Sequence, residues 1–350
     1  MNCFAFIVHP LTLNHYFQTL SLGFRVLAKS IASYRVKKSI FKVPAYSFLH
    51  IKNIQSKIGP RIEGYVIMCP LLPEQLVANR NEATDKILSA CKLAQNLGAK
   101  IIGLGGFTSV VTNGGLDLLA GSKIAITSGN SFTASLVVDS ILKLSKFYNG
   151  KQDIKVSIIG ASGDIGSACS LHLSHYFSSL ILVGRNVDKL NLLAQKIKQK
   201  RANIELEITT QIIYAIKKSD IVITATSAAG IIVEPEHLKA GAIFCDVSYP
   251  ANIDMKLASK RKDVIIFEGG LAKCTFFDNC DKFITRKINL FNPDRLIHGC
   301  FAETMLLAFE SRFENYSIGK GNVTIEKMSE ILTLGVRHGL ETFYPFEEIN

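Results

Sequence analysis

The chain has 350 residues, a length that suits two compact domains or one elaborate α/β unit. Because 48% of the residues are hydrophobic, nine are prolines and no low-complexity tract is present, the composition predicts a sizeable core and argues against long disordered segments. The net charge is +11, and no run of about 18 uncharged apolar residues occurs, so no transmembrane helix is expected.

The beginning of the chain is strongly basic. Residues 1–62 contain nine Lys or Arg and no Asp or Glu, which leaves only +2 for all the other residues. Apolar clusters alternate with the basic residues, and the stretch 22–31 has the pattern of an amphipathic helix. Such a segment attracts an acidic protein or an anionic membrane surface, or it is a solvated face without a partner. Nucleic acid is not expected, because no nucleic-acid-binding motif is present.

The next segment alternates strand and helix patterns, so residues 1–130 are predicted to form an α/β domain. Strands are expected within 62–68, 100–106 and 123–130, and helices from Pro73, over 84–97 and over 131–148. The helix over 84–97 follows a 3.6-residue period and is predicted to end at Gly98.

From Asp153 onward the alternation is sharper, and residues 131–290 are predicted to form a doubly wound parallel sheet of the Rossmann type. Six strands are expected, at 154–159, 179–186, 204–210, 220–228, 242–250 and 264–270, with a helix over 187–200 after the second strand. Residues 291–350 are predicted to be a mostly helical C-terminal segment.

Eight cysteines are present without any C-x-x-C pair, and several lie in apolar segments. This pattern fits reduced thiols in a cytoplasm better than disulfides, and no metal site is expected because paired Cys/His spacing is missing. The first residues lack a basic n-region and a small-residue cleavage site, so a secretory signal is not expected. We therefore predict a cytoplasmic location.

The sequence GASGDIG, Gly160–Gly166, follows an apolar strand and opens a helix. This context is typical of a dinucleotide-binding turn rather than a glycine-rich turn without a ligand. Gly160 suits the tight turn, Gly163 leaves room for a pyrophosphate, and Gly166 allows close helix–strand packing. The predicted cofactor-binding residues of this turn are Gly160, Ser162, Gly163, Asp164, Ile165 and Gly166.

Arg185 and Asn186 end the second strand, where an NAD enzyme usually has an acidic residue for the ribose. A guanidinium suits a 2′-phosphate instead, so NADPH is the expected cofactor. Thr226 at the end of the fourth strand and Gly269 and Gly270 at the end of the sixth are further cofactor-binding candidates. A simple turn is the alternative explanation for the two glycines.

Cys300 opens the sequence CFAETMLLAFE, whose apolar residues are spaced as in a helix. Most buried cysteines are small hydrophobic core residues, and Cys91, Cys169 and Cys245 are predicted to be of this kind. A position near a helix start lowers the pKa of a thiol, and His298 and Glu303 are close enough in sequence to assist proton transfer. From position alone, packing is still the more common role for such a cysteine.

Several segments resemble the long-chain acyl-(acyl carrier protein) reductases of cyanobacteria. They keep their order over residues 64–340 and are LGGFTS (104–109), TSGNSFTA (127–134), GASGDIGSA (160–168), LILVGRN (180–186), EGG (268–270), CFAETMLLAFE (300–310), VTIEKM (323–328) and VRHG (336–339). The motifs GGFTS and CFAE-x-MLL-x-FE are the specific ones, because many dehydrogenases share the glycine turn.

The resemblance implies that Cys300 is the catalytic nucleophile. Its thiolate would attack the thioester of an acyl carrier protein or acyl-CoA, and NADPH would reduce the resulting acyl-enzyme to a fatty aldehyde. Residues 1–130 would bind the acyl chain. Candidates for substrate or oxyanion binding are Thr108, Ser128, Asn130, Glu303 and the backbone amides near GGFTS, with helix capping as the alternative role for Asn130. The acid-free first 62 residues, His298 and Ser162 depart from the family pattern.

Two other functions remain open at this stage. The glycine turn also resembles those of shikimate and amino-acid dehydrogenases, which reduce a ketone directly with a Lys/Asp type pair, and no such pair is recognisable here. Alternatively, the chain is a non-catalytic NADP-binding sensor that docks at a membrane through its basic segment.

Overall fold

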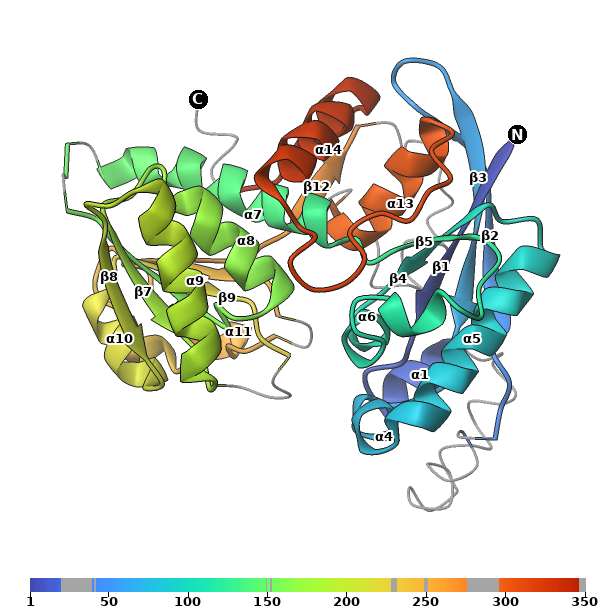
Figure 1. Cartoon of the computed structure of the whole chain (residues 1–350), viewed down its shortest axis with the longest axis horizontal. Helices are drawn as coiled ribbons and strands as arrows, with labels where there is room; N and C mark the ends of the chain where they lie inside the picture. Colours follow the sequence, from blue (N-terminus) through green and yellow to red (C-terminus); the bar gives the residue numbers. More distant parts are fainter. Residues whose placement is uncertain are drawn as a thin grey trace. The chain divides into compact units, whose positions relative to one another are not determined.

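The structure is a computed structural model that describes residues 1–19, 40, 42–148, 150–151, 153–227, 232–248, 251–275 and 296–345 (Figure 1). The chain divides into two compact units. The first contains residues 1–129, 273–319 and 333–341, and the second contains residues 130–272, 320–332 and 342–350.

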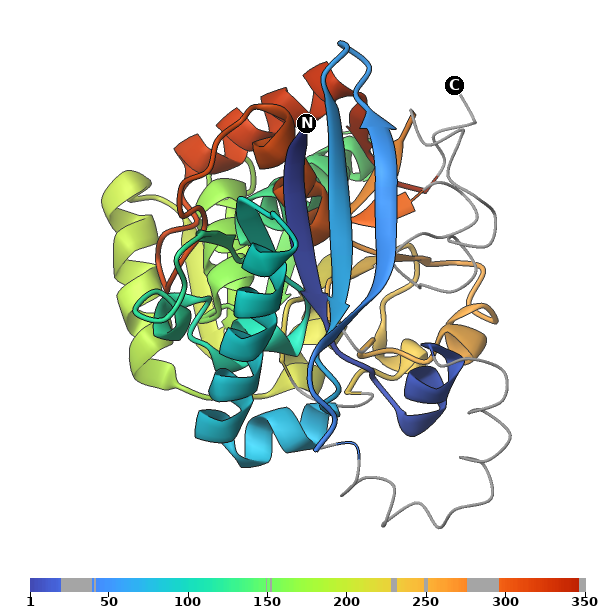
Figure 2. The same cartoon turned by 90° about the vertical axis from the view of Figure 1, so that its right-hand side faces the viewer.

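The first unit is built on a five-stranded sheet with the order β2-β3-β1-β4-β5. Its strands are β1 (Asn2–Val8), β2 (Tyr46–Gln55), β3 (Arg61–Met68), β4 (Ile101–Leu104) and β5 (Ala125–Thr127). All neighbours pair in parallel except β2, which runs antiparallel to β3 at the edge. Figure 2 shows β1, β3 and β2 side by side. The mixed α/β architecture confirms the predicted fold class.

Strand β1 lies in the middle of this sheet, whereas the sequence pattern predicted no strand before residue 62. Residues 4–7 are fully buried. A strand buried on both faces reads as a continuous apolar run, and the alternating pattern that marks a half-buried strand is then lost. The strand was missed for this reason.

Helices cover both faces of the first sheet. On one face, α5 (Arg80–Asn96) packs its apolar side against alternate residues of β1, such as Ala5 and Ile7. On the other face, α13 (Gly299–Phe309) places the Phe301 ring 5.6 Å from Phe4 and 5.0 Å from Phe6, both edge-to-face. The shorter helices of this unit are α1 (Leu13–Thr19), α4 (Pro73–Ala78) and α6 (Phe107–Val111).

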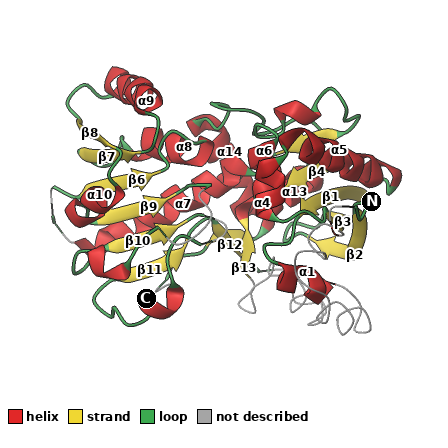
Figure 3. Ribbon diagram, turned by 90° about the horizontal axis from the view of Figure 1, so that it is seen from below, coloured by secondary structure: helices red, strands yellow, loops and turns green. Residues whose placement is uncertain are grey.

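The second unit has a six-stranded parallel sheet with the order β11-β10-β9-β6-β7-β8, as Figure 3 shows. Its strands are β6 (Lys155–Ile159), β7 (Ser179–Val183), β8 (Glu205–Thr209), β9 (Ile221–Thr224), β10 (Ile243–Asp246) and β11 (Ile265–Glu268). This is the doubly wound order of dinucleotide-binding domains, so the predicted Rossmann-type sheet is confirmed.

Both faces of the second sheet are covered by helices. One apolar cluster contains α7 (Asn130–Ser145), α8 (Asp164–Leu173) and α9 (Val187–Lys200), and the other contains α10 (Ile212–Lys218) and α11 (Met255–Ala258). The short segments η1 (Leu116–Leu118), η2 (Lys146–Tyr148) and η3 (Pro235–His237) are 3₁₀ turns.

Residues 291–350 do not form a third unit. Their described part consists mainly of α13, α14 (Ile325–His338) and the strands β13 (Leu296–His298) and β14 (Leu340–Thr342), which form a small sheet with β12 (Leu271–Cys274). Residues up to 319 are counted with the first unit and residues 320–332 with the second. The functions predicted for the two units stay predictions.

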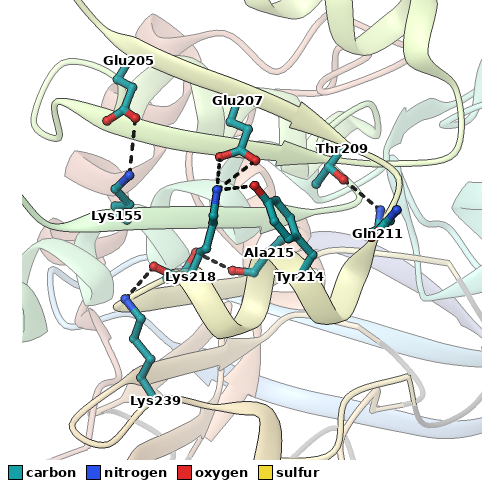
Figure 4. A network of polar contacts seen from close by, with 10 residues as sticks. Lys155, Glu205, Glu207, Thr209, Gln211, Tyr214, Ala215, Lys218 and Lys239 are labelled. Carbon is teal, nitrogen blue, oxygen red and sulfur yellow. Dashed lines mark hydrogen bonds and ion pairs between the residues drawn. The ribbon is translucent and has the colours of Figure 1, made fainter.

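A polar network ties helix α10 to the second sheet (Figure 4). The Lys218 ammonium contacts the Tyr214 hydroxyl and lies 3.2 Å from the Glu207 carboxylate, and the Lys239 ammonium donates to the Lys218 carbonyl at 2.6 Å. Ion pairs between exposed side chains contribute little to stability, so this network lies on the surface without adding much to it. Lys155 at the start of β6 forms a similar pair with Glu205 at the start of β8, with 3.4 Å between the charged atoms.

Much of the basic N-terminal segment lies outside the described residues. This includes the stretch 22–31 and five of its nine cations, whereas Lys42, Lys52, Lys57 and Arg61 are described and exposed. No helix in the described ranges has the length and apolar character needed to cross a bilayer. Across the same ranges, no group of three His, Cys, Asp or Glu side chains is arranged to hold a metal ion.

Candidate active site

Cys300 is the second residue of helix α13, which begins at Gly299, one residue before the predicted start. It is partly exposed, whereas the six other cysteines within the described ranges are buried, as predicted for Cys91, Cys169 and Cys245. His298 precedes the helix in an extended conformation and makes no side-chain capping bond. The structure therefore distinguishes Cys300 from the core cysteines.

Gly129 lies directly against Cys300. A Cβ atom built on Gly129 would lie 2.2 Å from the Cys300 Cα and 2.3 Å from its Cβ. Gly129 also has φ +74°, which disfavours any residue with a side chain. The TSGN turn after β5 can therefore approach the start of α13 only because this residue is glycine.

Protein atoms crowd the Cys300 sulfur even though the residue keeps some exposure. Burial raises the pKa of the Cys300 thiol to about 12, and the Glu303 carboxylate raises it further, whereas backbone hydrogen bonds from Phe301, Cys300 and Gly106 lower it. The first two N–H groups belong to the start of α13, and the third belongs to the turn after β4. The resting residue is therefore a thiol at neutral pH.

Glu303 lies one turn further along α13 and is fully buried. Its carboxylate accepts a hydrogen bond from the Thr127 hydroxyl and one from the Ser317 hydroxyl at 2.9 Å. Thr127 Oγ1 in turn accepts from the Gly129 N–H at 3.1 Å. Glu303 thus holds in place the turn that contacts Cys300. This is a structural role, distinct from the proton transfer for which the sequence made Glu303 a candidate.

A segment after α13 completes this arrangement. The Tyr316 N–H donates to the Ile126 carbonyl at 3.0 Å, and the Ile126 N–H donates to the Asn315 side chain at 3.0 Å. Ser317 follows in a left-handed conformation with φ 54°, and its carbonyl accepts from the Ser128 hydroxyl at 2.5 Å. No local sequence pattern identified Ser317, because its role depends on pairing with a strand far away in the chain.

The structure separates the four predicted oxyanion candidates. Ser128 and Glu303 belong to the cluster around the start of α13, as described above. Thr108 is buried in α6, and its hydroxyl donates to the Gly105 carbonyl at 2.9 Å, so it stabilises its own turn. Asn130 is the first residue of α7 and is counted with the second unit.

The glycine turn of the second unit has the geometry that its sequence indicates. Gly160 has φ +86°, and a Cβ there would lie 2.4 Å from the Ala225 carbonyl oxygen. A Cβ on Gly166 would lie 2.3 Å from the Gly160 carbonyl oxygen. Gly163 is exposed just before α8, with its ideal Cβ position at least 3.3 Å from other atoms. The exposed Gly163 thus lies in front of a helix N-terminus, an arrangement that suits a pyrophosphate.

The other predicted turn residues flank this space. Ser162, Asp164 and Ile165 are partly exposed, and Asp164 begins α8. Burial raises the pKa of the Asp164 carboxyl, while Lys320 lowers it. At the end of β7, Arg185 is exposed, and the Asn186 side chain accepts from the Lys189 N–H at 2.9 Å to cap α9. Asn186 thus has a structural role in addition to its predicted one.

At the carboxyl end of β10, Asp246 organises the neighbouring loops, a role that no sequence pattern predicted. Its buried carboxylate accepts from the Thr224 hydroxyl at 2.6 Å and from the N–H groups of Ser248 and Asn252 at 3.0 and 2.6 Å. Ser248 Oγ then accepts from the Thr226 N–H at 3.2 Å. Asp246 thereby fixes the position of the predicted cofactor-binding Thr226.

Packing accounts for the glycines after β11. A Cβ on Gly269 would lie 2.2 Å from the Cys245 sulfur, and one on Gly270 would lie 2.7 Å from Thr133 Cγ2. Gly270 also has φ +74°. Both residues must therefore be glycine for structural reasons, and contact with a cofactor stays a prediction.

Comparison with known proteins identifies the family. Over 303 residues the chain is 32% identical to the long-chain acyl-(acyl-carrier-protein) reductase of Synechococcus elongatus, covering 83% of this chain and 85% of that protein. The chain belongs to the long-chain acyl-(acyl-carrier-protein) reductase family. The family model for shikimate/quinate 5-dehydrogenases matches residues 143–267.

This reductase-family chain has further similarities. It is 29% identical over 345 residues to the aminotransferase PigE of a Serratia species, which covers 96% of this chain but only 39% of that longer protein. A quinate dehydrogenase of Corynebacterium glutamicum in complex with NAD covers 75% of this chain and 87% of its own, with 13% identity and a TM-score of 0.37. The family of reductases to which the chain belongs and the doubly wound sheet together make the protein an oxidoreductase with a dinucleotide-binding fold in its second unit.

Proposed function

We propose that this reductase uses NADPH to convert a long-chain fatty acyl thioester, carried by acyl carrier protein or coenzyme A, to a fatty aldehyde through an acyl-enzyme on Cys300. The observation that carries the proposal is the single partly exposed cysteine of the described ranges, placed at the start of helix α13 and in close contact with Gly129. A shared family with an acyl-(acyl-carrier-protein) reductase supports the substrate class.

In the first step, the Cys300 sulfur attacks the thioester carbonyl. The Cys300 thiol gives up its proton and the carrier thiol leaves with one, so a thioester is exchanged for a thioester without net charge change. The N–H groups of Phe301, Cys300 and Gly106 stabilise the thiolate. The carbonyl oxygen of the bound acyl group would come next to the start of helix α13, where the first N–H groups have no partner within the helix and would stabilise its developing charge.

In the second step, the acyl group is reduced and released. When bound, NADPH supplies a hydride to the acyl carbonyl. The backbone N–H groups near Cys300 then hold the resulting oxyanion until the carbon–sulfur bond breaks, which releases the aldehyde and returns the Cys300 thiolate. Glu303 keeps Thr127 in place and thereby keeps Gly129 against Cys300 throughout the cycle.

The second unit would hold NADPH. The helix N-terminus behind the exposed Gly163 fits the pyrophosphate, and the exposed Arg185 guanidinium fits a 2′-phosphate. Among the other predicted cofactor-binding residues, Thr226 is held in place by the loop that Asp246 organises.

The basic N-terminal segment would attract the acyl donor. Acyl carrier proteins are acidic, and four cations of this segment are exposed in the described part. A peripheral contact with an anionic membrane is the alternative use of the same charge, and either use fits a cytoplasmic enzyme. Replacing Lys42, Lys52 and Lys57 by Glu should weaken binding of the carrier, and unchanged affinity would argue against this steering role.

The decisive experiment is intact-mass analysis after incubation with a long-chain acyl carrier protein, or with acyl-CoA, in the absence of NADPH. Wild type is compared with Cys300→Ala. Cys280→Ser is the control for the loss of a cysteine that has no predicted catalytic role. An acyl adduct on wild type and Cys280→Ser alone, discharged as aldehyde when NADPH is added, supports the proposal. An adduct that persists in Cys300→Ala, or no adduct on any variant, contradicts it.

Direct reduction of a ketone is the second candidate, because the shikimate/quinate dehydrogenase model matches residues 143–267. That reaction needs no acyl-enzyme. Turnover of a hydroxy-acid substrate that is insensitive to Cys300→Ala would favour it over acyl reduction.

A further inference from the structure

Asp246 is a buried residue at the carboxyl end of strand β10, with 3% of its surface exposed. Strands β10, β9 and β6 are neighbours in the sheet of the second unit and run parallel, so their carboxyl ends lie at one edge. In doubly wound sheets, ligands bind in the crevice beyond this edge. Asp246 therefore lies on the side of the sheet where a dinucleotide is expected.

The hydrogen bonds of Asp246 require a carboxylate. Its Oδ1 accepts from the Thr224 hydroxyl at 2.6 Å and from the Ser248 N–H at 3.0 Å, while its Oδ2 accepts from the Asn252 N–H at 2.6 Å. Each of these three partners is a donor. An amide side chain has only one acceptor oxygen, so the NH₂ group of Asp246→Asn would face at least one donor and leave it unsatisfied. A buried donor without an acceptor is costly, so even this isosteric change is expected to move the loops.

The two loop residues that Asp246 holds both contact Thr226. Ser248 Oγ accepts from the Thr226 N–H at 3.2 Å, and Asn252 Oδ1 accepts from the Thr226 hydroxyl at 3.1 Å. Thr226 in turn lies beside the glycine turn, because a Cβ atom on Gly160 would be 3.1 Å from its Cγ2 atom. One intervening residue thus connects Asp246 to the backbone of Thr226, and another connects it to the side chain.

We propose that Asp246 is a positioning residue for the dinucleotide cofactor. Its carboxylate holds Ser248 and Asn252, and these two residues hold Thr226 against the glycine turn, in the position that binds the cofactor. The placement of Thr226 depends on these contacts alone, whereas its effect on the cofactor rests on the function proposed above. If Asp246 only completed its own hydrogen bonds, its loss would lower stability and leave cofactor affinity unchanged.

The test compares Asp246→Asn with Asp220→Asn. The Asp220 carboxylate is also buried and accepts from the Lys155 N–H at 3.0 Å and from the Lys151 ammonium at 2.8 Å, but Asp220 directly precedes β9, at the opposite edge of the sheet. The same chemical change is thus made at both edges. Three quantities are measured without an acyl substrate: the Kd for NADPH by fluorescence titration, the hydrogen-exchange rate of the Thr226 amide without cofactor, and thermal unfolding.

We expect Asp246→Asn to raise the Kd for NADPH about tenfold and to speed exchange of the Thr226 amide about tenfold, whereas Asp220→Asn changes each by less than about twofold. Ser248→Ala removes only the acceptor of the Thr226 N–H and should raise the Kd about threefold. Because Ser248 acts on Thr226 under the control of Asp246, adding Ser248→Ala to Asp246→Asn should have little further effect.

Equal Kd values for Asp246→Asn and Asp220→Asn would overturn the proposal and leave Asp246 as a core residue. If Asp246→Asn did not fold, an unchanged Kd and an unchanged Thr226 exchange rate in Ser248→Ala would overturn it equally. A wild type that bound neither NADPH nor NADH would contradict the proposed cofactor, and the exchange rates would still decide the placement of Thr226. Missing acyl adducts would contradict the proposed acyl-enzyme without affecting this comparison.

Discussion

Gly129 and Cys300 are in contact through their backbones: a Cβ atom on Gly129 would overlap the Cys300 Cα at 2.2 Å. The two residues are far apart in sequence, and one opens the turn after β5 while the other opens α13. The position of the candidate nucleophile therefore depends on the absence of one side chain.

Gly129→Ala is expected to displace the start of α13. The positive φ costs about 1–2 kcal/mol, and overlap with backbone atoms adds about 1–3 kcal/mol of destabilisation. Denaturant unfolding should show the combined loss, and Cys300 alkylation should change with it. Gly98→Ala is the matched control, because Gly98 has φ +87° with nothing within 4 Å. If both variants lost the same stability, the close contact with Cys300 would have no energetic effect.

Glu303→Gln should make Cys300 more reactive. The Glu303 carboxylate raises the pKa of the thiol, so a neutral side chain of the same shape lowers that pKa and increases the thiolate fraction at pH 8. The Gln oxygen can still accept from Thr127 and Ser317, so the stability should fall by only about 1 kcal/mol. Alkylation rates and thermal unfolding measure the two effects, with the exposed Glu314→Gln as control. Slower alkylation in Glu303→Gln at unchanged stability would contradict this assignment.

The reactivity of Cys300 should rise throughout the accessible alkaline range. Burial raises the pKa of this thiol to about 12, so the thiolate fraction increases about tenfold per pH unit below that value. Alkylation measured between pH 7 and 10 should therefore show no plateau in the protein without substrate. A plateau near pH 7 would show that the resting residue is already a thiolate.

Stability should decline at high pH for the same reason. Burial raises the pKa of Cys69 and of Cys91 to about 12, well above the ordinary pKa of a thiol. Because the unfolded thiols ionise at lower pH than the folded ones, the stabilisation is complete below pH 9 and is lost as the pH rises toward 12. Urea unfolding at pH 8 and pH 10 tests this sign. Cys91→Ala should flatten the slope, and an unchanged slope would mean that another group causes the decline.

Arg185→Ala should change cofactor preference. If the guanidinium binds a 2′-phosphate, its loss raises the KM for NADPH about tenfold or more and leaves the KM for NADH nearly unchanged. Lys189→Ala is the control, since Lys189 is also exposed near the start of α9. An equal effect of Arg185→Ala on both cofactors would argue against recognition of the phosphate.

The second unit was largely predictable from the sequence, because its signals are local. Apolar runs separated by segments of helical periodicity predicted its six strands, and the spacing of Gly160 and Gly166 predicted the glycine turn. Helix α9 was predicted with its observed bounds, Val187–Lys200. In each case the residues that determine the structure lie within a few positions of one another.

The surroundings of Cys300 were decided only by the tertiary structure. Helix α13 could be expected from the motif, but the contacts of Gly129 and the hydroxyl donors of Glu303 could not. Thr127 lies 176 positions before Glu303. Such contacts depend on which strands become neighbours in the sheet and on which helix packs over them, and local periodicity carries no information about either.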